Sequence, residues 1–336
     1  MERVTADARA ACDEHRWGDA WRLYSQVPGD LDIDDLGRFA IAAYLTGRDE
    51  EGFDLWGRAH RASIDAGSIH RAAHFGVRLS QALLFKGDLA RSRGWVDRVA
   101  QVLDAAGIDC VEQGYLEHGL GMARLFESGD LAAALAHFER AAKVAARFAD
   151  RELATVARMS AGRIRIYLGE VADGLTMLDA AVVSIEAGEL SPFATGDAWC
   201  TVIDACAELS DVVRCRSWTT SMQRWCDEQQ ELVLYRGHCL IHAAEVLLVL
   251  GRWREGVEEA RHACERLAGP LPAVLGIASH LEADLLRLLG DVDGADAAYR
   301  RAGELGHDPQ PGLALLRLAQ GDVRGALAMI RRVLTE

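Results

Sequence analysis

A short sequence pattern recurs along this chain and constrains its fold more than any single motif. An apolar stretch with helical spacing ends at a glycine followed by aspartate, glutamate or arginine, and a second amphipathic stretch then begins. The turns are Trp17-Gly18-Asp19, Gly47-Arg48, Gly87-Asp88, Gly129-Asp130, Gly169-Glu170, Gly251-Arg252, Gly290-Asp291 and Gly321-Asp322, with Leu209-Ser210-Asp211 in the place of one missing glycine. From Gly47 to Gly290 they recur about every 40 residues, compared with roughly 34 in a standard tetratricopeptide repeat (TPR). This period predicts a helical-repeat array.

Each turn has a physical reason. Glycine adopts the left-handed conformation that ends a helix, and an acidic residue after it caps or charges the start of the next helix. The clearest unit is Leu125–Phe148, in which one predicted stripe contains Leu131, Ala134, Leu135, Phe138, Ala141 and Ala142. Because one hairpin cannot cover its own apolar faces, the units must stack.

Strand signals are missing, and the prolines fall between predicted helices or at helix starts. We therefore expect an all-α fold, a right-handed TPR-like helical-repeat solenoid of about eight helical hairpins. Residues 1–46 are expected to form an N-terminal helical cap and first helix pair, and residues 47–336 the repeat array. The segment Val27–Asp35, which contains PGDLDIDD, is the expected irregular connection.

Composition restricts the classes of partner. The chain has 37 basic and 51 acidic residues, a net charge of −14, and no cluster of lysine or arginine, which argues against nucleic-acid binding. No apolar run approaches the roughly 20 residues of a membrane span, and the start MERVTADARAACDEH has no secretory signal. We therefore expect a cytoplasmic protein. The eight cysteines stand singly, so most are expected to be core residues rather than disulfides.

The most distinctive segments are Trp218–Cys226, Tyr235–Glu245 and Asp308–Gly321. They belong to a stretch, Gly47–Glu336, that resembles the TPR-like region of actinobacterial LuxR-type transcriptional regulators. In that family the helical repeat serves sensing and partner contact, and the resemblance implies the same here. A G-x-x-x-x-G-K-[ST] phosphate loop and a basic helix-turn-helix are both absent, so ATP hydrolysis and DNA binding are not implied. The chain is either a stand-alone relative or a piece of a larger regulator.

The densest polar face is expected on the helix from about Tyr235 to Leu250. We predict a ligand-binding groove formed by Arg236, His238, His242, Glu245, Tyr235, Trp225, Trp199, Asp197 and Cys200. Arginine and tryptophan together suit an anionic or aromatic ligand, through bidentate hydrogen bonds and stacking. The alternative is that the tryptophans are inter-repeat core and that Arg236 pairs with Asp227 or Glu228.

The same predicted helix carries residues that could bind a metal ion or act as a nucleophile. His238 and His242 have the i, i+4 spacing of shared metal ligands, and Glu245 or Cys239 lies near them in sequence. A lone helix supplies too few ligands, and the pattern is not H-E-x-x-H, so groove histidines are favoured and no metal or other cofactor is expected. Neighbouring helical residues point about 100° apart, so Cys239 and His238 do not form an attacking pair.

Other inner helices carry matching polar groups: Arg71, His74, Arg78 and Gln81; Glu117 and His118; Arg158, Arg163 and Arg165; Asp204 beside the residues already named; His280 and Asp284. Together they predict a charged groove over several repeats, suited to an extended peptide or a small metabolite. A solvated inner face is the alternative interpretation.

Two functional classes follow. The favoured one is a regulatory binding module whose concave groove binds a peptide, a protein partner or a small effector. The other is an enzyme on a helical-repeat scaffold that uses groove histidine, glutamate and arginine residues as acid-base groups. An enzyme needs a closed pocket with convergent polar groups, whereas a peptide binder needs an open groove. The sequence defines neither the ligand nor the oligomeric state.

Overall fold

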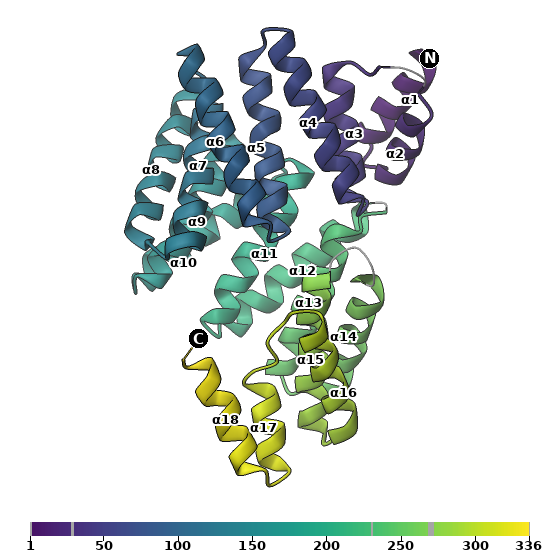
Figure 1. Ribbon diagram of the computed structural model, residues 1–336, viewed down its shortest axis with the longest axis vertical. Helices are drawn as coiled ribbons and strands as arrows, with labels where there is room; N and C mark the ends of the chain where they lie inside the picture. Colours follow the sequence, from purple (N-terminus) through teal and green to yellow (C-terminus); the bar gives the residue numbers. More distant parts are fainter. Residues whose placement is uncertain (1, 28–29, 230, 268–271, 336) are drawn as a thin grey trace. The chain divides into compact units, whose positions relative to one another are not determined.

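A computed structural model describes residues 2–27, 30–229, 231–267 and 272–335, and every regular element in these ranges is helical (Figure 1). The chain forms two compact units. The first unit is Met1–Glu208 with Asp227–Leu232, and the second is Leu209–Cys226 with Val233–Glu336. The expected all-α helical-repeat fold is confirmed. The expected division into residues 1–46 and 47–336 stays a prediction.

The first unit contains α1 (Glu2–Asp13), α2 (Trp17–Ser25), α3 (Ile33–Leu45), α4 (Asp49–Asp65), α5 (Ile69–Phe85), α6 (Leu89–Ala106), α7 (Glu112–Ala123), the π-helical turn η1 (Arg124–Ser128), α8 (Leu131–Phe148), α9 (Arg151–Tyr167), α10 (Val171–Glu186) and α11 (Pro192–Glu208). The second unit contains α12 (Val212–Glu228, of which the last two residues belong to the first unit), α13 (Leu234–Val249), α14 (Trp253–Leu267), α15 (Pro272–Leu289), α16 (Val292–Glu304), α17 (Gly312–Ala319) and α18 (Val323–Val333). Within the described residues, none of these helices is both long and apolar enough to cross a lipid bilayer.

Consecutive helices pack as hairpins. Eight pairs are formed in the described part of the chain: α1/α2, α3/α4, α5/α6, α7/α8, α9/α10, α13/α14, α15/α16 and α17/α18. The odd-numbered helices also contact one another, α1 with α3, α5 with α7, α7 with α9 and α9 with α11 in the first unit, and α13 with α15 and α15 with α17 in the second. Each unit therefore has a layer of odd-numbered helices that contact one another.

The glycine turns have the predicted geometry. Gly129 ends η1 with a φ of +63°, a left-handed conformation that glycine adopts without a side-chain penalty. The Asp130 carboxylate then accepts a hydrogen bond from the Ala133 N–H at 3.0 Å and caps α8. The same capping bond recurs after three other glycines, at Asp88, Asp291 and Asp322. Helix ends are thus fixed by bonds between near neighbours in sequence.

The turn predicted at Leu209-Ser210-Asp211 is confirmed, whereas the turn predicted at Trp17-Gly18-Asp19 is wrong. Ser210 has a φ of +57°, and Asp211 caps α12 by accepting from the Arg214 N–H at 3.1 Å, as expected where glycine is missing. The turn expected at Trp17-Gly18-Asp19 is wrong, because α2 already begins at Trp17. The left-handed residue there is His15, with a φ of +57°, so Gly18 lies inside the helix.

The predicted connection between α2 and α3 is shorter than Val27–Asp35. Asp32 is the N-cap of α3 and accepts from the Asp35 N–H at 2.8 Å, so Ile33–Asp35 forms the first helical turn. Residues 28 and 29 lie outside the described residues. A second set of glycines, which the sequence pattern did not include, adopts positive φ between hairpins: Gly67, Gly107, Gly188 and Gly306.

The apolar stripe predicted on α8 is confirmed. Ala134 and Phe138 are fully buried and form a core cluster with Ala161 and Ile164 of α9. Small residues let neighbouring helices approach closely, and the clearest case joins α9 to α10. A Cβ atom at Gly174 would lie 2.6 Å from the carbonyl oxygen of Gly162. Backbone contact of this kind tolerates no side chain.

The N-cap at Asp130 offers a direct test. Asp130→Ala removes the acceptor for the Ala133 N–H, so we expect the free energy of unfolding to fall by about 1 kcal/mol. Asp130→Asn keeps an acceptor at the same place and is expected to cost only a few tenths of a kcal/mol. Urea denaturation followed by circular dichroism measures both, and equal losses for the two variants would contradict the capping role.

Candidate functional site

The second unit contains six of the nine residues predicted as a groove. Tyr235 is buried on α13, with its ring centroid 5.8 Å from that of half-buried Trp225 on α12. His242 is also buried, and its Nδ1 lies 3.1 Å from Glu245 Oε2, whose side chain is partly exposed. His238 is half-buried. The side chain of the sixth residue, Arg236, lies outside what the structure describes.

The other three predicted residues lie on α11, in the first unit. Trp199 and Cys200 are buried there. Asp197 is half-buried, and its pKa is raised to about 6 by burial and by the charge of Asp204, against an opposing effect of Arg163. The two groups thus belong to different compact units, and the shared ligand site remains a prediction.

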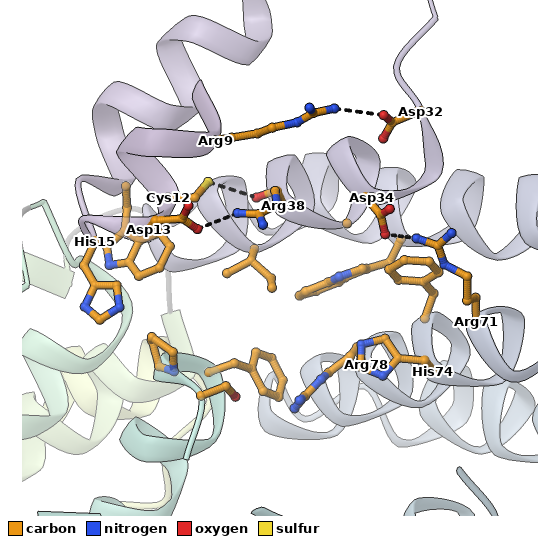
Figure 2. A pocket seen from close by; sticks show the side chains of 18 of the residues that line it. Arg9, Cys12, Asp13, His15, Asp32, Asp34, Arg38, Arg71, His74 and Arg78 are labelled. Carbon is orange, nitrogen blue, oxygen red and sulfur yellow. Dashed lines mark hydrogen bonds and ion pairs between the residues drawn. The ribbon is translucent and has the colours of Figure 1, made fainter. Parts of the chain in front are cut away.

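The first unit contains a pocket of about 1060 Å³. Its lining residues come mainly from the inner helices α1, α3, α5, α7 and the start of α11 (Figure 2). They are Arg9, Cys12, Asp13, His15, Trp17, Asp32, Asp34, Gly37, Arg38, Ile41, Trp56, His70, Arg71, His74, Phe75, Arg78, Glu112, Ser191, Pro192 and Phe193. We call this the first-unit pocket. It contains four arginines and four carboxylates, with aromatic rings between them.

One wall of the pocket is a row of basic residues on α5. Arg71, His74 and Arg78 are spaced at i, i+3 and i+7, which places them on one helix face, and Figure 2 shows them together at the pocket. The sequence pattern assigns these three residues and Gln81 to the inner face. The three line the pocket, and Gln81 is not among the lining residues.

A buried ion pair anchors this wall. Arg78 Nη2 donates to Glu152 Oε1 at 2.6 Å, and the two side chains are 11% and 13% exposed. Glu152 Oε2 accepts from the Ser191 N–H at 2.7 Å, so one carboxylate joins α5 and α9 to the segment that starts α11. Burial opposes ionisation of Glu152, but Arg78 and the Ser191 hydrogen bond outweigh it and lower the pKa of Glu152 to about 2. The pair is therefore charged at neutral pH.

His74 lies between the two arginines of the row. The His74 side chain is exposed at the pocket surface. The packed helices around it reduce its solvation and, together with the charges of Arg78 and Arg71, lower the pKa of His74 below its usual 6.5, against an opposing effect of Glu152. Its imidazole is thus neutral at pH 7. The middle of this wall has positive charge on both sides and a neutral hydrogen-bonding ring between them.

The opposite wall is made by α1 and α3. Arg9 forms two hydrogen bonds of 2.7 Å with the carboxylate of Asp35, which also accepts from the Tyr24 hydroxyl at 2.9 Å and is buried. Arg38 donates to Asp13 at 2.7 Å. Figure 2 shows the Arg38 pair, and it also shows that Asp34 at the start of α3 forms an ion pair with Arg71 across the pocket.

Aromatic rings close the pocket between these walls. Trp56 and Phe193 pack edge to face with ring centroids 5.9 Å apart, and Tyr44 lies behind them, 5.4 Å and 5.5 Å away. The Arg78 guanidinium lies 5.0 Å from the Phe193 ring centroid, within cation–π distance. Trp17 is held by a hydrogen bond of 3.2 Å from its Nε1 to Gln229 Oε1. The apolar surfaces are therefore fixed in place.

Half of the lining residues belong to residues 1–46, which the sequence predicts only as an N-terminal cap and first helix pair. Among them are Arg9, Asp13, Asp34 and Arg38, whose i, i+4 spacing of opposite charges is the signal in the sequence that could identify this wall. Within the described ranges, no group of three or more histidine, cysteine or acidic residues is arranged to hold a metal ion. The pocket lining presents charged groups, hydrogen-bonding groups and aromatic rings.

Comparison with known proteins bears on the fold. No family model matches the sequence, and no curated protein does. A crystal structure of a Rap protein complexed with competence and sporulation factor is similar to this chain, with a TM-score of 0.55 and 11% identity over 99% of this chain and 86% of that one. This likeness supports a TPR-like helical-repeat fold.

Two further structures match with lower scores. One is a signal transduction ATPase (STAND) protein with a tetratricopeptide repeat sensor from Pyrococcus horikoshii, at a TM-score of 0.46 and 13% identity over 94% of this chain and 47% of that one. The other is a human IFIT1 dimer with m7Gppp-AAAA, at 0.48 and 14% over 96% and 72%. Neither carries an argument about ligands.

The Arg78–Glu152 pair yields a prediction for stability. Glu152→Gln leaves the buried Arg78 without a counter-charge, so we expect unfolding to become easier by about 3 kcal/mol at pH 7. Because the pKa of Glu152 falls from 4.5 to about 2 in the folded protein, its contribution is complete above pH 4.5 and is lost as pH falls toward 2. Glu152→Gln should therefore lack this loss of unfolding free energy between pH 4.5 and pH 2.

A matched control is Glu189→Gln, which removes a carboxylate paired with the exposed Arg151 at 2.8 Å. That change is expected to cost less than about 1 kcal/mol. Denaturation in urea at several pH values between 2 and 7 measures both variants. If the two glutamine variants lose the same amount, the buried pair is not the anchor of this wall.

Proposed function

We propose that this protein is a regulatory binding module that holds an extended peptide segment of a partner in the first-unit pocket. The observation that carries the proposal is the pocket itself, about 1060 Å³ in volume and lined by side chains from several inner helices. Pockets for small ligands commonly have roughly 300 to 1,000 Å³. This one offers room for several amino-acid residues.

The lining supports a peptide in particular. A peptide presents both charges, apolar side chains and backbone amides, and the pocket has four arginines, four carboxylates and the rings of Trp56 and Phe193. The Rap protein, which has a similar fold, was crystallised in complex with another molecule, competence and sporulation factor, and we propose that this fold binds a partner here as well. A small effector in the same pocket is the alternative occupant.

We further propose a regulatory role of the kind implied by the resemblance to LuxR-type regulators, in which a repeat array senses a ligand or partner. The net charge of −14 supports a protein or peptide partner rather than nucleic acid. The nine predicted groove residues, on α11, α12 and α13, also remain proposed as ligand contacts. Among them, Glu245 has a side chain that is 37% exposed.

Blocking the pocket tests this function. Ile41 is a half-buried lining residue of α3, and Ile41→Arg places a long charged side chain in the pocket. We expect the wild-type protein to retain a defined subset of a random hexapeptide pool in affinity-selection mass spectrometry, and the variant to bind that subset roughly 10-fold more weakly or worse, a loss of about 1.4 kcal/mol.

Val183→Arg is the control, because Val183 on α10 is 67% exposed and lies outside the pocket. It should bind like the wild type, and circular dichroism checks that both variants are folded. Native mass spectrometry of the purified protein reveals a small effector if one is bound instead. Retention of no peptide subset by the wild type, or equal retention by Ile41→Arg, contradicts the proposed function.

A further inference from the structure

We infer that Arg71 binds a carboxylate of the peptide in the first-unit pocket. This carboxylate displaces Asp34, which pairs with Arg71 in the free protein. The inference rests on the proposed function. The group is either the peptide's C-terminal carboxylate or an aspartate or glutamate side chain. The two sources share the same chemistry, and the experiment below separates them.

The four arginines of the pocket are held in different ways. Arg78 is committed to a buried partner, Glu152, and is itself buried. Arg9 is tied by two hydrogen bonds to Asp35, whose side chain is only 3% exposed, and it forms a third to the exposed Asp32. These two arginines cannot exchange their partners without leaving a carboxylate buried and uncompensated. They belong to the framework of the pocket.

Arg71 and Arg38 are different, because their carboxylate partners are exposed. The side chains of Arg71 and Asp34 are 33% and 67% exposed, and those of Arg38 and Asp13 are 40% and 68% exposed. Exposed pairs of this kind are weak, since water solvates each partner nearly as well as the other partner does. A ligand carboxylate can therefore replace an exposed aspartate at little cost.

Of these two, Arg71 is the better site for an anion. Arg71 shares its helix face with Arg78, whose charge Glu152 balances, and with the neutral His74, so no acidic group on this face opposes an anion. Arg38 instead lies among acidic groups, because Asp13 pairs with it and Asp35 is close enough to feel its charge. A carboxylate that replaces Asp34 is attracted by the Arg71 guanidinium, and the neutral His74 ring beside it can donate a hydrogen bond.

Asp34 shows that a carboxylate fits this position. It lies in the first turn of α3, and its ion pair with Arg71 reaches across the pocket in Figure 2. The N-terminal end of a helix favours a negative charge, so Asp34 remains stabilised at α3 after it releases Arg71. Asp34 thus acts as an internal competitor that a stronger carboxylate ligand displaces.

The experiment uses the full chain and three hexapeptide pools. The first pool is amidated and free of aspartate and glutamate, the second has the same composition with a free C-terminal carboxylate, and the third is amidated but contains aspartate and glutamate. We expect the wild type to retain peptides of the second or third pool roughly 10-fold better than those of the first. Which of the two pools is retained identifies the source of the carboxylate.

Two variants separate the roles of the pair. Arg71→Gln should abolish the preference for carboxylate peptides, whereas Asp34→Asn should tighten their binding by about 2-fold to 5-fold, because the competitor is removed. Matched controls are Arg58→Gln and Asp54→Asn, both at exposed positions of α4 outside the pocket lining. These controls should bind like the wild type.

NMR titration of His74 gives a second readout that a merely structural role would not change. A bound carboxylate peptide should raise the pKa of His74, and an amidated peptide without acidic residues should leave it unchanged. If the wild type retains all three pools equally, or if Asp34→Asn weakens binding, the carboxylate site is wrong while the peptide pocket stands. If the wild type retains no peptides, both proposals are wrong.

Discussion

Every hairpin of this fold leaves an apolar face that only the next hairpin can cover. The faces meet through small residues: Ala40, Ala43 and Ala59 are completely buried, and α10 approaches α9 so closely at Gly174 that a Cβ atom would not fit. This close stacking places the odd-numbered helices side by side. The pocket exists because the stacking brings α1, α3 and α5 together from distant parts of the sequence.

The features that the sequence predicted are those that depend on near neighbours. A glycine with left-handed φ and an aspartate that caps the next helix, as at Gly129 and Asp130, interact within four positions, so their pattern is visible in the sequence. The wrong turn at Gly18 follows the same logic. The residue with left-handed φ is His15. Residues other than glycine adopt positive φ so seldom that a histidine in the sequence does not predict such a turn.

The candidate site was predictable only in part for the same reason. Helical periodicity places Arg71, His74 and Arg78 on one inner face, and the structure confirms them in the pocket lining. Their partners are not visible in the sequence. Glu152 is 74 positions from Arg78, and only the stacking of hairpins decides that these two charges meet. The local pattern of histidines on α13 predicts a ligand-binding face, but His242 is buried there.

The pocket separates two uses of the same chemistry. Glu152 stabilises the folded chain, since its removal leaves the largely buried Arg78 without a counter-charge. Asp35 is buried as well, and it accepts hydrogen bonds from Arg9 and from the Tyr24 hydroxyl. Exposed carboxylates such as Asp34 balance an arginine without contributing much to stability. Because different carboxylates serve stability and ligand binding, the walls can stay rigid while a ligand carboxylate replaces Asp34 at Arg71. A pocket with every arginine in a buried pair would be more rigid but would have no charge to offer a ligand.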